Sequence, residues 1–176
     1  MALGNCLTMS LSGVLAQLVD VEANVGHGLP GIHVVGQTDT AISESRDRIK
    51  TAAFNSHLPW PKTKVVVSMS PASLPKSGSH FDLPIALAIL AAQAEVNFPT
   101  KGSTPSPARR LQRTLVLGEL GLDGSVRPVA GIIPALLAAR EQGIATLIVP
   151  PGNAAEATLV PDMDVLVASS LKEAFG

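Results

Sequence analysis

Residues 75–84 gather side chains that could serve as a nucleophile and its activating base within one short segment. Ser77 and Ser79 offer hydroxyl groups, Lys76 an amine and His80 an imidazole. A serine–lysine hydrolase needs a hydroxyl within hydrogen-bond reach of a lysine that is desolvated enough to lose its proton near neutral pH. Lys76 lies in a proline- and serine-rich stretch, which predicts an exposed loop where the amine stays charged. Peptidase chemistry is therefore not the favoured interpretation.

The other histidines and the carboxylates are not spaced as a metal site or an acid–base pair. The four histidines occupy separate segments at ligand-incompatible spacings: His27, His33, His57 and His80. His80 adjoins a predicted helix start, where a neutral imidazole could bind an anion or contact Asp82, but a loop-packing role is favoured. Asp82, Glu119 and Asp123 are interpreted as cap and turn residues. The sequence thus predicts no metal site.

Gly26, Gly28 and Gly31 match the glycine spacing of dinucleotide-binding loops. That fingerprint works only where the third glycine enters a helix whose amides face the pyrophosphate. Residues 32–35 instead have the pattern of a strand, and Pro30 removes one amide from the loop. A structural hairpin is therefore favoured. No Walker A phosphate loop is present either, so this chain by itself is not expected to hydrolyse ATP.

Two groups of basic residues are candidates for contact with DNA or a partner protein. The first comprises Arg46, Arg48 and Lys50 on a predicted helix, where Glu44 and Asp47 interleave and Glu44 is spaced i,i+4 from Arg48. A solvated helix face is favoured there. The second group lies within residues 97–113, which contain no acidic side chain: Lys101, Arg109, Arg110 and Arg113. Weak, salt-dependent phosphate contact is a hypothesis for this second group.

Composition predicts one α/β domain with an aliphatic core. The chain has 176 residues, of which 46% are hydrophobic, 15% charged and only 3% aromatic. A formal net charge of −1 gives no overall attraction to nucleic acid or anionic membranes. The single cysteine, Cys6, excludes an internal disulfide, and no basic stretch precedes an apolar segment at the N-terminus. The sequence therefore predicts a cytoplasmic location and no membrane partner.

Periodicity and turn residues predict the elements that position these side chains. In chain order, the first half is expected to contain two strands within 11–35 joined at 26–31, a helix from Thr38 or Asp39 to about 55, a strand at 65–67 and a helix over 83–94 with Asp82 as N-cap. The longest apolar run, residues 83–92, is half of the ~20 residues that a membrane span requires, so it predicts a buried helix.

The second half is expected to open with a poorly ordered surface loop over 97–113, which holds three prolines. The elements expected after it are a strand over 114–120, a turn at Asp123-Gly124, a strand around Val126, a helix over 131–142 ended by Gly143, a strand over 146–149, a helix started by Asn153 with Glu156, a strand over 165–168 and a helix started by Ser170 with Glu173.

Two segments, residues 75–84 and 118–131, resemble the frame of a Lon-type serine protease domain. In that family the first segment carries the serine nucleophile on a loop that opens a helix, and a helix just after the second carries the activating lysine. Here His80 falls at the serine position and Ala135 at the lysine position. The resemblance implies a Lon-protease-like α/β domain of the ribosomal protein S5 domain 2-like type, a mixed sheet with packed helices, without the catalytic dyad.

Motifs along nearly the whole chain also resemble the N-terminal domain of the magnesium-chelatase-like AAA+ ATPases associated with competence. The matching stretches are residues 28–31, 34–36, 44–48, 70–76, 81–86, 118–120 and 149–150. The resemblance implies that residues 1–176 form a single N-terminal domain. It also implies a C-terminal AAA+ ATPase module outside this chain, which would bind ATP and Mg²⁺ and assemble as a hexamer.

For the full protein the resemblance implies ATP-driven remodelling of branched DNA during uptake and recombination. This chain is then expected to hold no cofactor, and its partners would be its own AAA+ module, further copies in the hexamer, and DNA, which it would bind weakly when alone. Two other classes stay open, a degenerate Lon-type peptidase and a subunit of a magnesium chelatase complex. The sequence favours the noncatalytic domain of a DNA-remodelling motor over these two, because it lacks a catalytic dyad and a cluster of metal ligands.

Overall fold

The structure, a computed structural model, describes residues 2–12, 15–35, 39–70, 81–97 and 111–175. Its strands are β1 (Ala2–Ser12), β2 (Leu15–Val25), β3 (Gly31–Val34), β4 (Lys64–Ser70), β5 (Thr114–Val116), β6 (Glu119–Leu120), β7 (Val126–Arg127), β8 (Thr146–Val149) and β9 (Asp164–Val167). Its helices are α1 (Asp39–Asn55), α2 (Asp82–Asn97), α4 (Ile132–Glu141), the 3-10 turn η2 (Pro151–Asn153), α5 (Ala154–Ala157) and α6 (Leu171–Phe175).

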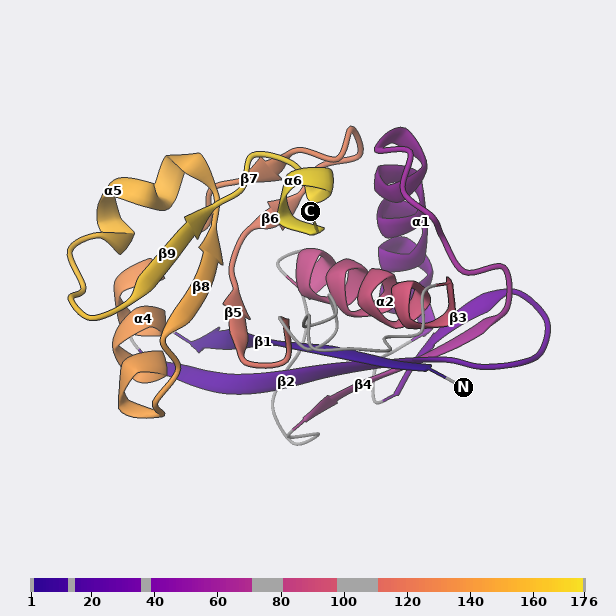
Figure 1. Cartoon of the computed structure of the whole chain (residues 1–176), viewed down its shortest axis with the longest axis horizontal. Coiled ribbons are helices and arrows are strands. Elements are labelled where there is room, and N and C mark those ends of the chain that lie inside the picture. Colours follow the sequence, from indigo (N-terminus) through magenta and orange to yellow (C-terminus); the bar gives the residue numbers. More distant parts are fainter. Residues whose placement is uncertain (1, 13–14, 36–38, 71–80, 98–110, 176) are drawn as a thin grey trace.

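A seven-stranded mixed sheet forms the centre of the domain, with strand order β3-β4-β2-β1-β5-β8-β9. Strands β6 and β7 form a separate antiparallel ribbon. Figure 1 shows α1, α2 and α6 gathered on one side of the long β1–β2 ribbon, and α4 and α5 beside β8 and β9. This architecture confirms the predicted mixed α/β fold class.

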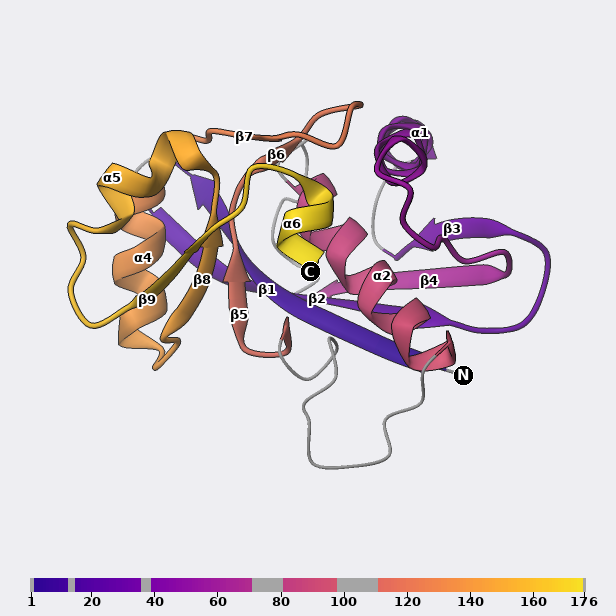
Figure 2. The same cartoon turned by 45° about the horizontal axis from the view of Figure 1, so that its top comes forward.

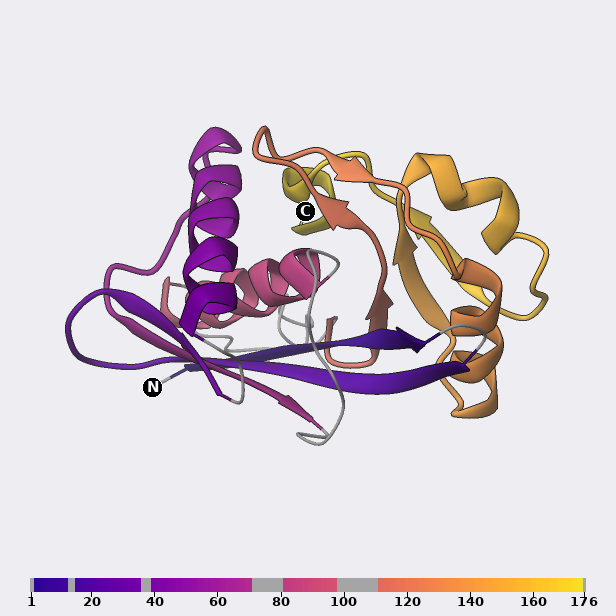
Figure 3. The ribbon, with the colours of Figure 1, turned by 180° about the vertical axis from the view of Figure 1, so that it is seen from behind.

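The hairpin that opens the fold is formed by β1 and β2, which pair from Ala2 opposite Val25 to Ser12 opposite Leu15. Figure 3 shows this ribbon running along most of the molecule. The predicted hairpin around residues 26–31 is wrong, because β4 lies between β2 and β3 and pairs with both. Strand β1 gave a weak signal in the sequence because it contains only one β-branched residue, Thr8.

Side-chain alternation along the central strands divides the core into two clusters. Cys6, Val116 and Ile148 belong to the first cluster, and their chain neighbours Leu7, Leu115 and Leu147 belong to the second. Because successive side chains of a strand point to opposite faces, the two clusters lie on opposite faces of the sheet. Helix α2 packs into the first cluster and α4 into the second.

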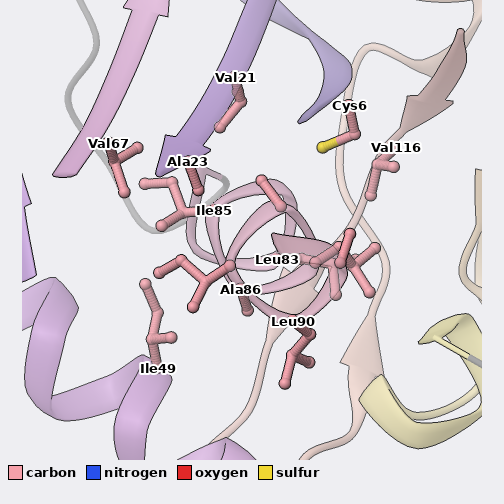
Figure 4. Close-up of a cluster of buried hydrophobic side chains, with 14 of the residues drawn as sticks. Cys6, Val21, Ala23, Ile49, Val67, Leu83, Ile85, Ala86, Leu90 and Val116 are labelled. Atoms are coloured by element: carbon pink, nitrogen blue, oxygen red, sulfur yellow. The ribbon is translucent and has the colours of Figure 1, made fainter. Parts of the chain in front are cut away.

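The first three turns of α2 are enclosed on every side. All residues from Phe81 to Ala92 are buried, which confirms the prediction that this apolar run is a core helix. Strands β1 and β2 lie against α2, and α1 and α6 contact it elsewhere; Figure 2 shows α2 lying along the ribbon. Figure 4 shows side chains of the surrounding elements: Cys6 of β1, Val21 and Ala23 of β2, Val67 of β4, Val116 of β5 and Ile49 of α1.

The sheet is narrowest between β1 and β5, where the parallel register consists of one pair, Leu7 with Leu115. Thr8 reinforces this seam, because its buried Oγ1 donates a 2.8 Å hydrogen bond to the carbonyl of Val116. Beyond the seam the sheet continues in parallel through β8 and β9.

The predicted strand over 114–120 proved to be two strands, β5 and β6, which belong to different sheets. Gly118 separates them with a φ of 148°, and a Cβ at this position would lie 2.7 Å from Cγ1 of Val126. The backbone therefore leaves the large sheet at a residue that only glycine suits.

Most of the remaining boundaries are confirmed. The Asp123-Gly124 turn joins β6 to β7, and Gly143 ends α4 with a φ of 76°. Ser170 caps α6, since its Oγ accepts a 3.1 Å hydrogen bond from the amide of Glu173. Asn153 is a correction: it makes no side-chain cap for α5.

The side chain of Asn153 instead holds the backbone of Val129, donating to its carbonyl and accepting from its amide. It also donates a 3.1 Å hydrogen bond to Glu156. Asn153 therefore ties η2 to the segment that leads into α4. The predicted loop over 97–113 falls mainly on residues 98–110, outside the described residues. Within the described ranges, no helix combines the length and apolarity needed to cross a membrane.

Gly4→Ala is expected to destabilise the domain by about 1 to 3 kcal/mol, because overpacking forces well-packed elements apart. A Cβ at Gly4 would lie 2.5 Å from the carbonyl oxygen of Ala88 and from the amide nitrogen of Ala92, both backbone atoms of α2. Gly26→Ala is the matched control, since a Cβ there meets nothing within 4 Å. Urea unfolding compares the two variants, and equal losses would contradict this close contact of β1 with α2.

Candidate functional site

A buried ion pair lies at the start of α2, where Asp82 belongs to the segment 75–84 that resembles the Lon frame. The carboxylate of Asp82 has no exposed side-chain surface and accepts hydrogen bonds from Nε of Arg48 at 2.5 Å and from Nη2 at 3.3 Å. Oγ of Ser45 donates a third bond to Asp82 at 3.0 Å. Arg48 and Ser45 are three residues apart on α1, so both reach the same neighbour.

This arrangement corrects two predictions. The carboxylate of Asp82 was expected to cap α2, but its bonds instead join α2 to α1. Arg48 was placed on a solvated helix face, but its main partner is the buried carboxylate. The expected pairing of Arg48 with Glu44 is present only as a 3.9 Å contact at the surface.

The electrostatics indicate a structural anion. Burial raises the pKa of Asp82 above its ordinary value, while the hydrogen bonds from Arg48 and Ser45 oppose this shift. The hydrogen bond to Asp82 raises the pKa of Arg48, so its guanidinium stays charged. With its oxygens occupied by three donor groups, this carboxylate is poorly placed to take up or release a substrate proton.

Ala135 stands where the resemblance to Lon places the catalytic lysine. It is fully buried in α4, in a cluster with Ile132, Leu136 and Ala139. Helix α4 contains no lysine, and its single cation, Arg140, is exposed in the last turn. No amine is therefore available on α4 to activate a serine. Ser77, Ser79 and His80 lie outside the described residues.

Arg46 and Lys50 lie apart from the ion pair, on another face of α1. They line a hollow of about 270 Å³ together with Asp47 and Trp60. Trp60 is half-buried and packs against the first core cluster. The structure thus brings two of the predicted contact residues next to an aromatic side chain.

Arg113 is exposed just before β5 and is not brought together with Arg46 and Lys50. Strand register shows the separation. Leu115, two residues after Arg113, pairs with Leu7, which pairs with Asp20, which pairs with Ser70 at the end of β4. The hollow reaches Val65 near the start of β4, about 16 Å away along the strand at the usual rise per residue. Lys101, Arg109 and Arg110 lie outside the described residues, so their role stays a prediction.

Two features were missed by reasoning from the sequence. The Asp82–Arg48 pair had a usable signal, because Ser45 and Arg48 are spaced to share the helix face of the apolar residues Ile49 and Ala52. Trp60 also had a usable signal in the sequence: Pro59 and Pro61 restrict the backbone on both sides of it, which indicates a fixed position for its side chain. Within the described ranges, no three His, Cys, Asp or Glu side chains gather as a metal site.

Comparison with protein families matches residues 21–153 to the family described as subunit ChlI of Mg-chelatase. An uncharacterized protein of Mycobacterium tuberculosis is 44% identical over 165 residues, which cover 94% of this chain and 31% of that protein. Competence protein ComM of Haemophilus influenzae is 36% identical over 171 residues, which cover 97% of this chain and 31% of ComM. The chain thus spans about a third of the length of these curated relatives.

A weaker similarity connects the chain with proteases. Lon protease of Mycolicibacterium smegmatis is 24% identical over 172 residues, which cover 93% of this chain and 20% of that protein. Identity at this level supports a Lon-like fold and carries no conclusion about activity. It agrees with the mixed sheet and the packed helices described above.

Arg48→Ala is expected to destabilise the domain by about 3 to 5 kcal/mol, because it leaves the buried carboxylate of Asp82 without its cation. Asp82→Asn is expected to cost less, since Arg48 retains 32% exposure of its side chain and can reach water. Arg46→Ala on the same helix is the control, with an expected change within about 0.5 kcal/mol. Urea unfolding measures all three, and a loss for Arg48→Ala as small as the control's would rule out a structural role for the pair.

Acid is expected to reduce the deficit of the same Arg48→Ala variant. Burial still raises the pKa of Asp82 there, and the opposing hydrogen bonds from the guanidinium are gone. A carboxyl group whose pKa rises on folding costs most stability when ionised, so its penalty is largest at neutral pH and fades as the pH falls. Unfolding of both proteins at neutral pH and at about pH 5 tests this; a gap that widens in acid would contradict the assignment.

Proposed function

This chain belongs to the family of subunit ChlI of magnesium chelatase, and from this premise we propose that it is the noncatalytic N-terminal domain of a larger AAA+ ATPase. Its similarity to a competence protein supports the coarser description of a magnesium-chelatase-like, competence-associated protein. In the proposal the domain supports assembly or DNA engagement of a hexameric, helicase-like motor that acts on branched DNA during competence and recombination.

The relative lengths support a further module. The matched segment makes up 31% of ComM, so most of that protein lies outside the part similar to this chain. We assign the remainder of the full protein to a C-terminal AAA+ module that binds ATP and Mg²⁺, in line with the resemblance described above. The partners of this chain would then be its own motor, neighbouring subunits and DNA.

The observation that carries the noncatalytic assignment is the burial of Ala135. A Lon-type mechanism needs a lysine amine that contacts the serine, and this position of α4 holds a methyl group packed among aliphatic side chains. The anion at the start of α2, Asp82, is held by Arg48 and Ser45. These contacts suit a scaffold in which the position of the Lon lysine has become part of the core.

A magnesium chelatase subunit is the second candidate, favoured by the description of the matching family. Magnesium insertion into a tetrapyrrole by the full protein and its partner subunits would support it. ATP-dependent movement of a DNA branch point, without metal insertion, would support the motor instead.

We expect this chain to show neither peptidase nor ATPase activity. Ala135 removes the activating amine, and the sequence lacks the phosphate loop that would hold a nucleotide. Casein cleavage and phosphate release are the measurements, with an active Lon protease as positive control. Casein turnover that disappears in Ser77→Ala or Ser79→Ala would overturn the first half, and ATP hydrolysis that coelutes with the purified chain would overturn the second.

The isolated domain is expected to bind DNA only weakly and with steep salt dependence, mainly through Lys101, Arg109, Arg110 and Arg113. Each phosphate contact contributes about 0.9 to the slope of log affinity against log salt for duplex DNA. Changing all four residues to alanine is therefore expected to reduce that slope by up to about 3.6. Fluorescence anisotropy with branched and linear duplexes at two salt concentrations measures the effect.

Arg140→Ala combined with Lys172→Ala is the charge control for that experiment, since both side chains are exposed on other elements. Submicromolar binding at physiological salt that survives the fourfold change would move the main DNA surface elsewhere on the domain. Absence of binding at either salt concentration would leave contact with the motor or with neighbouring subunits as the function of this domain.

A further inference from the structure

Trp60, the only tryptophan of the chain, stands between two hollows of the surface. One hollow, of about 270 Å³, is lined by Arg46, Lys50 and Trp60 among others. The second, of about 570 Å³, is lined by His27, Lys62 and Trp60 among others. The two hollows share Thr63 as well as Trp60, so they adjoin each other along the same stretch of chain.

The elements around Trp60 hold it in a fixed position. Part of the indole packs against the first core cluster, and the side chain is half-buried. Pro59 and Pro61 restrict the backbone on either side of it. Arg46 and Lys50 are spaced i,i+4 on α1, so they project from the same helix face. A site with an ordered aromatic and two aligned cations loses little conformational entropy on binding.

The charge at this place is positive although the chain as a whole is not. Arg46, Lys50 and Lys62 line the two hollows, and Asp47 is the one acidic side chain among the lining residues. Lys64 is close by, since its carbonyl accepts a 3.0 Å hydrogen bond from the amide of Gly26, a lining residue of the larger hollow. Within the described ranges, both salt bridges belong to Arg48, so none of these four cations is neutralised by one. The hollows therefore form an anion-attracting surface around an aromatic ring.

We propose that this surface binds single-stranded DNA, with a base against the indole of Trp60 and the flanking phosphates on Arg46, Lys50 and Lys62. Nonspecific single-strand sites combine these two components, an aromatic platform for the bases and a positive groove for the backbone. A duplex hides the faces of its bases, so the aromatic component selects an unpaired strand. This inference rests on the proposed DNA engagement and names the form of DNA that this site recognises.

The location of the surface suits a strand that passes across the domain. The hollows flank Trp60 in succession, so a chain of nucleotides could continue from the Arg46 and Lys50 side to the Lys62 side. The contact of Arg48 with the buried carboxylate of Asp82 joins α1 to α2 and so helps to keep Arg46 and Lys50 in place.

Trp60 makes the test direct, because all indole fluorescence of the chain comes from this residue. A thymidine oligonucleotide is titrated into the 176-residue chain at low and physiological salt, with tryptophan fluorescence and anisotropy of a labelled oligonucleotide as the two readouts. Saturable quenching that weakens with salt is expected. Thymidine monophosphate in a parallel titration is expected to quench far less, because it provides one phosphate only.

Variants separate the two components of the site. Trp60→Ala is expected to reduce affinity about 5- to 150-fold, the range for loss of one stacked base, and Trp60→Phe to restore most of it. Arg46→Gln with Lys50→Gln leaves the core intact and is expected to lower the single-strand salt slope by about 1.4, or 0.7 for each phosphate. Arg140→Gln with Lys172→Gln, the same charge change on other elements, is expected to bind as the wild type does.

Three outcomes would overturn the assignment. Oligonucleotide binding without any change in tryptophan fluorescence, and unaffected by Trp60→Ala and by the Arg46 and Lys50 double variant, would place single-strand binding elsewhere while DNA engagement stands. Equal affinity for the mononucleotide and the oligonucleotide would indicate a nucleotide pocket. Absence of binding to oligonucleotide and to branched and linear duplexes alike, even at low salt, would remove the proposed DNA engagement together with this site.

Discussion

The burial of α2 is the constraint on which the rest of the domain depends. A helix whose side chains from Phe81 to Ala92 are all buried has no face for solvent, so other elements must enclose it completely. The β1–β2 ribbon lies on one side and comes close at Gly4, where there is no Cβ to keep the backbones apart. Because α2 begins at Asp82, the same burial removes a carboxylate from water and makes its contact with Arg48 necessary.

Local signals in the sequence predicted the helices and the later turns well. The apolar run of α2, the glycine that ends α4 and the Ser170 cap of α6 are each determined by residues within a few positions of one another. Pairing of strands depends on distant partners instead, and this is where the prediction was wrong. The glycines at 26–31 marked a real break in the chain, but β4 inserts between β2 and β3, and no local pattern reveals such an insertion.

The candidate site shows the same division between local and distant information. The sequence indicated that Arg46, Arg48 and Lys50 share a helix, but not that Arg48 reaches inward to Asp82, 34 residues further along the chain. Trp60 lies ten residues beyond Lys50, and only the packing of the connection beneath α1 brings the two side chains to the same hollow. The spacing of charged residues along a helix does not show which of them pairs with a buried side chain of opposite charge on another element.

The narrow seam between β1 and β5 has a mechanical consequence. Within the described ranges, one register pair and the Thr8 hydroxyl link the N-terminal strands of the sheet to β5, whereas β1 and β2 are paired over their full lengths. The β1–β5 junction is therefore expected to be less stiff than the sheet on either side of it. A force that pulls the two halves apart would separate β1 from β5 first. Helix α2 contacts β1 and β2, and the core cluster to which it belongs also includes Val116 of β5 and Ile148 of β8, so the same cluster packs against both halves. The core around α2 thus holds the two halves of the sheet together where their strand pairing is shortest.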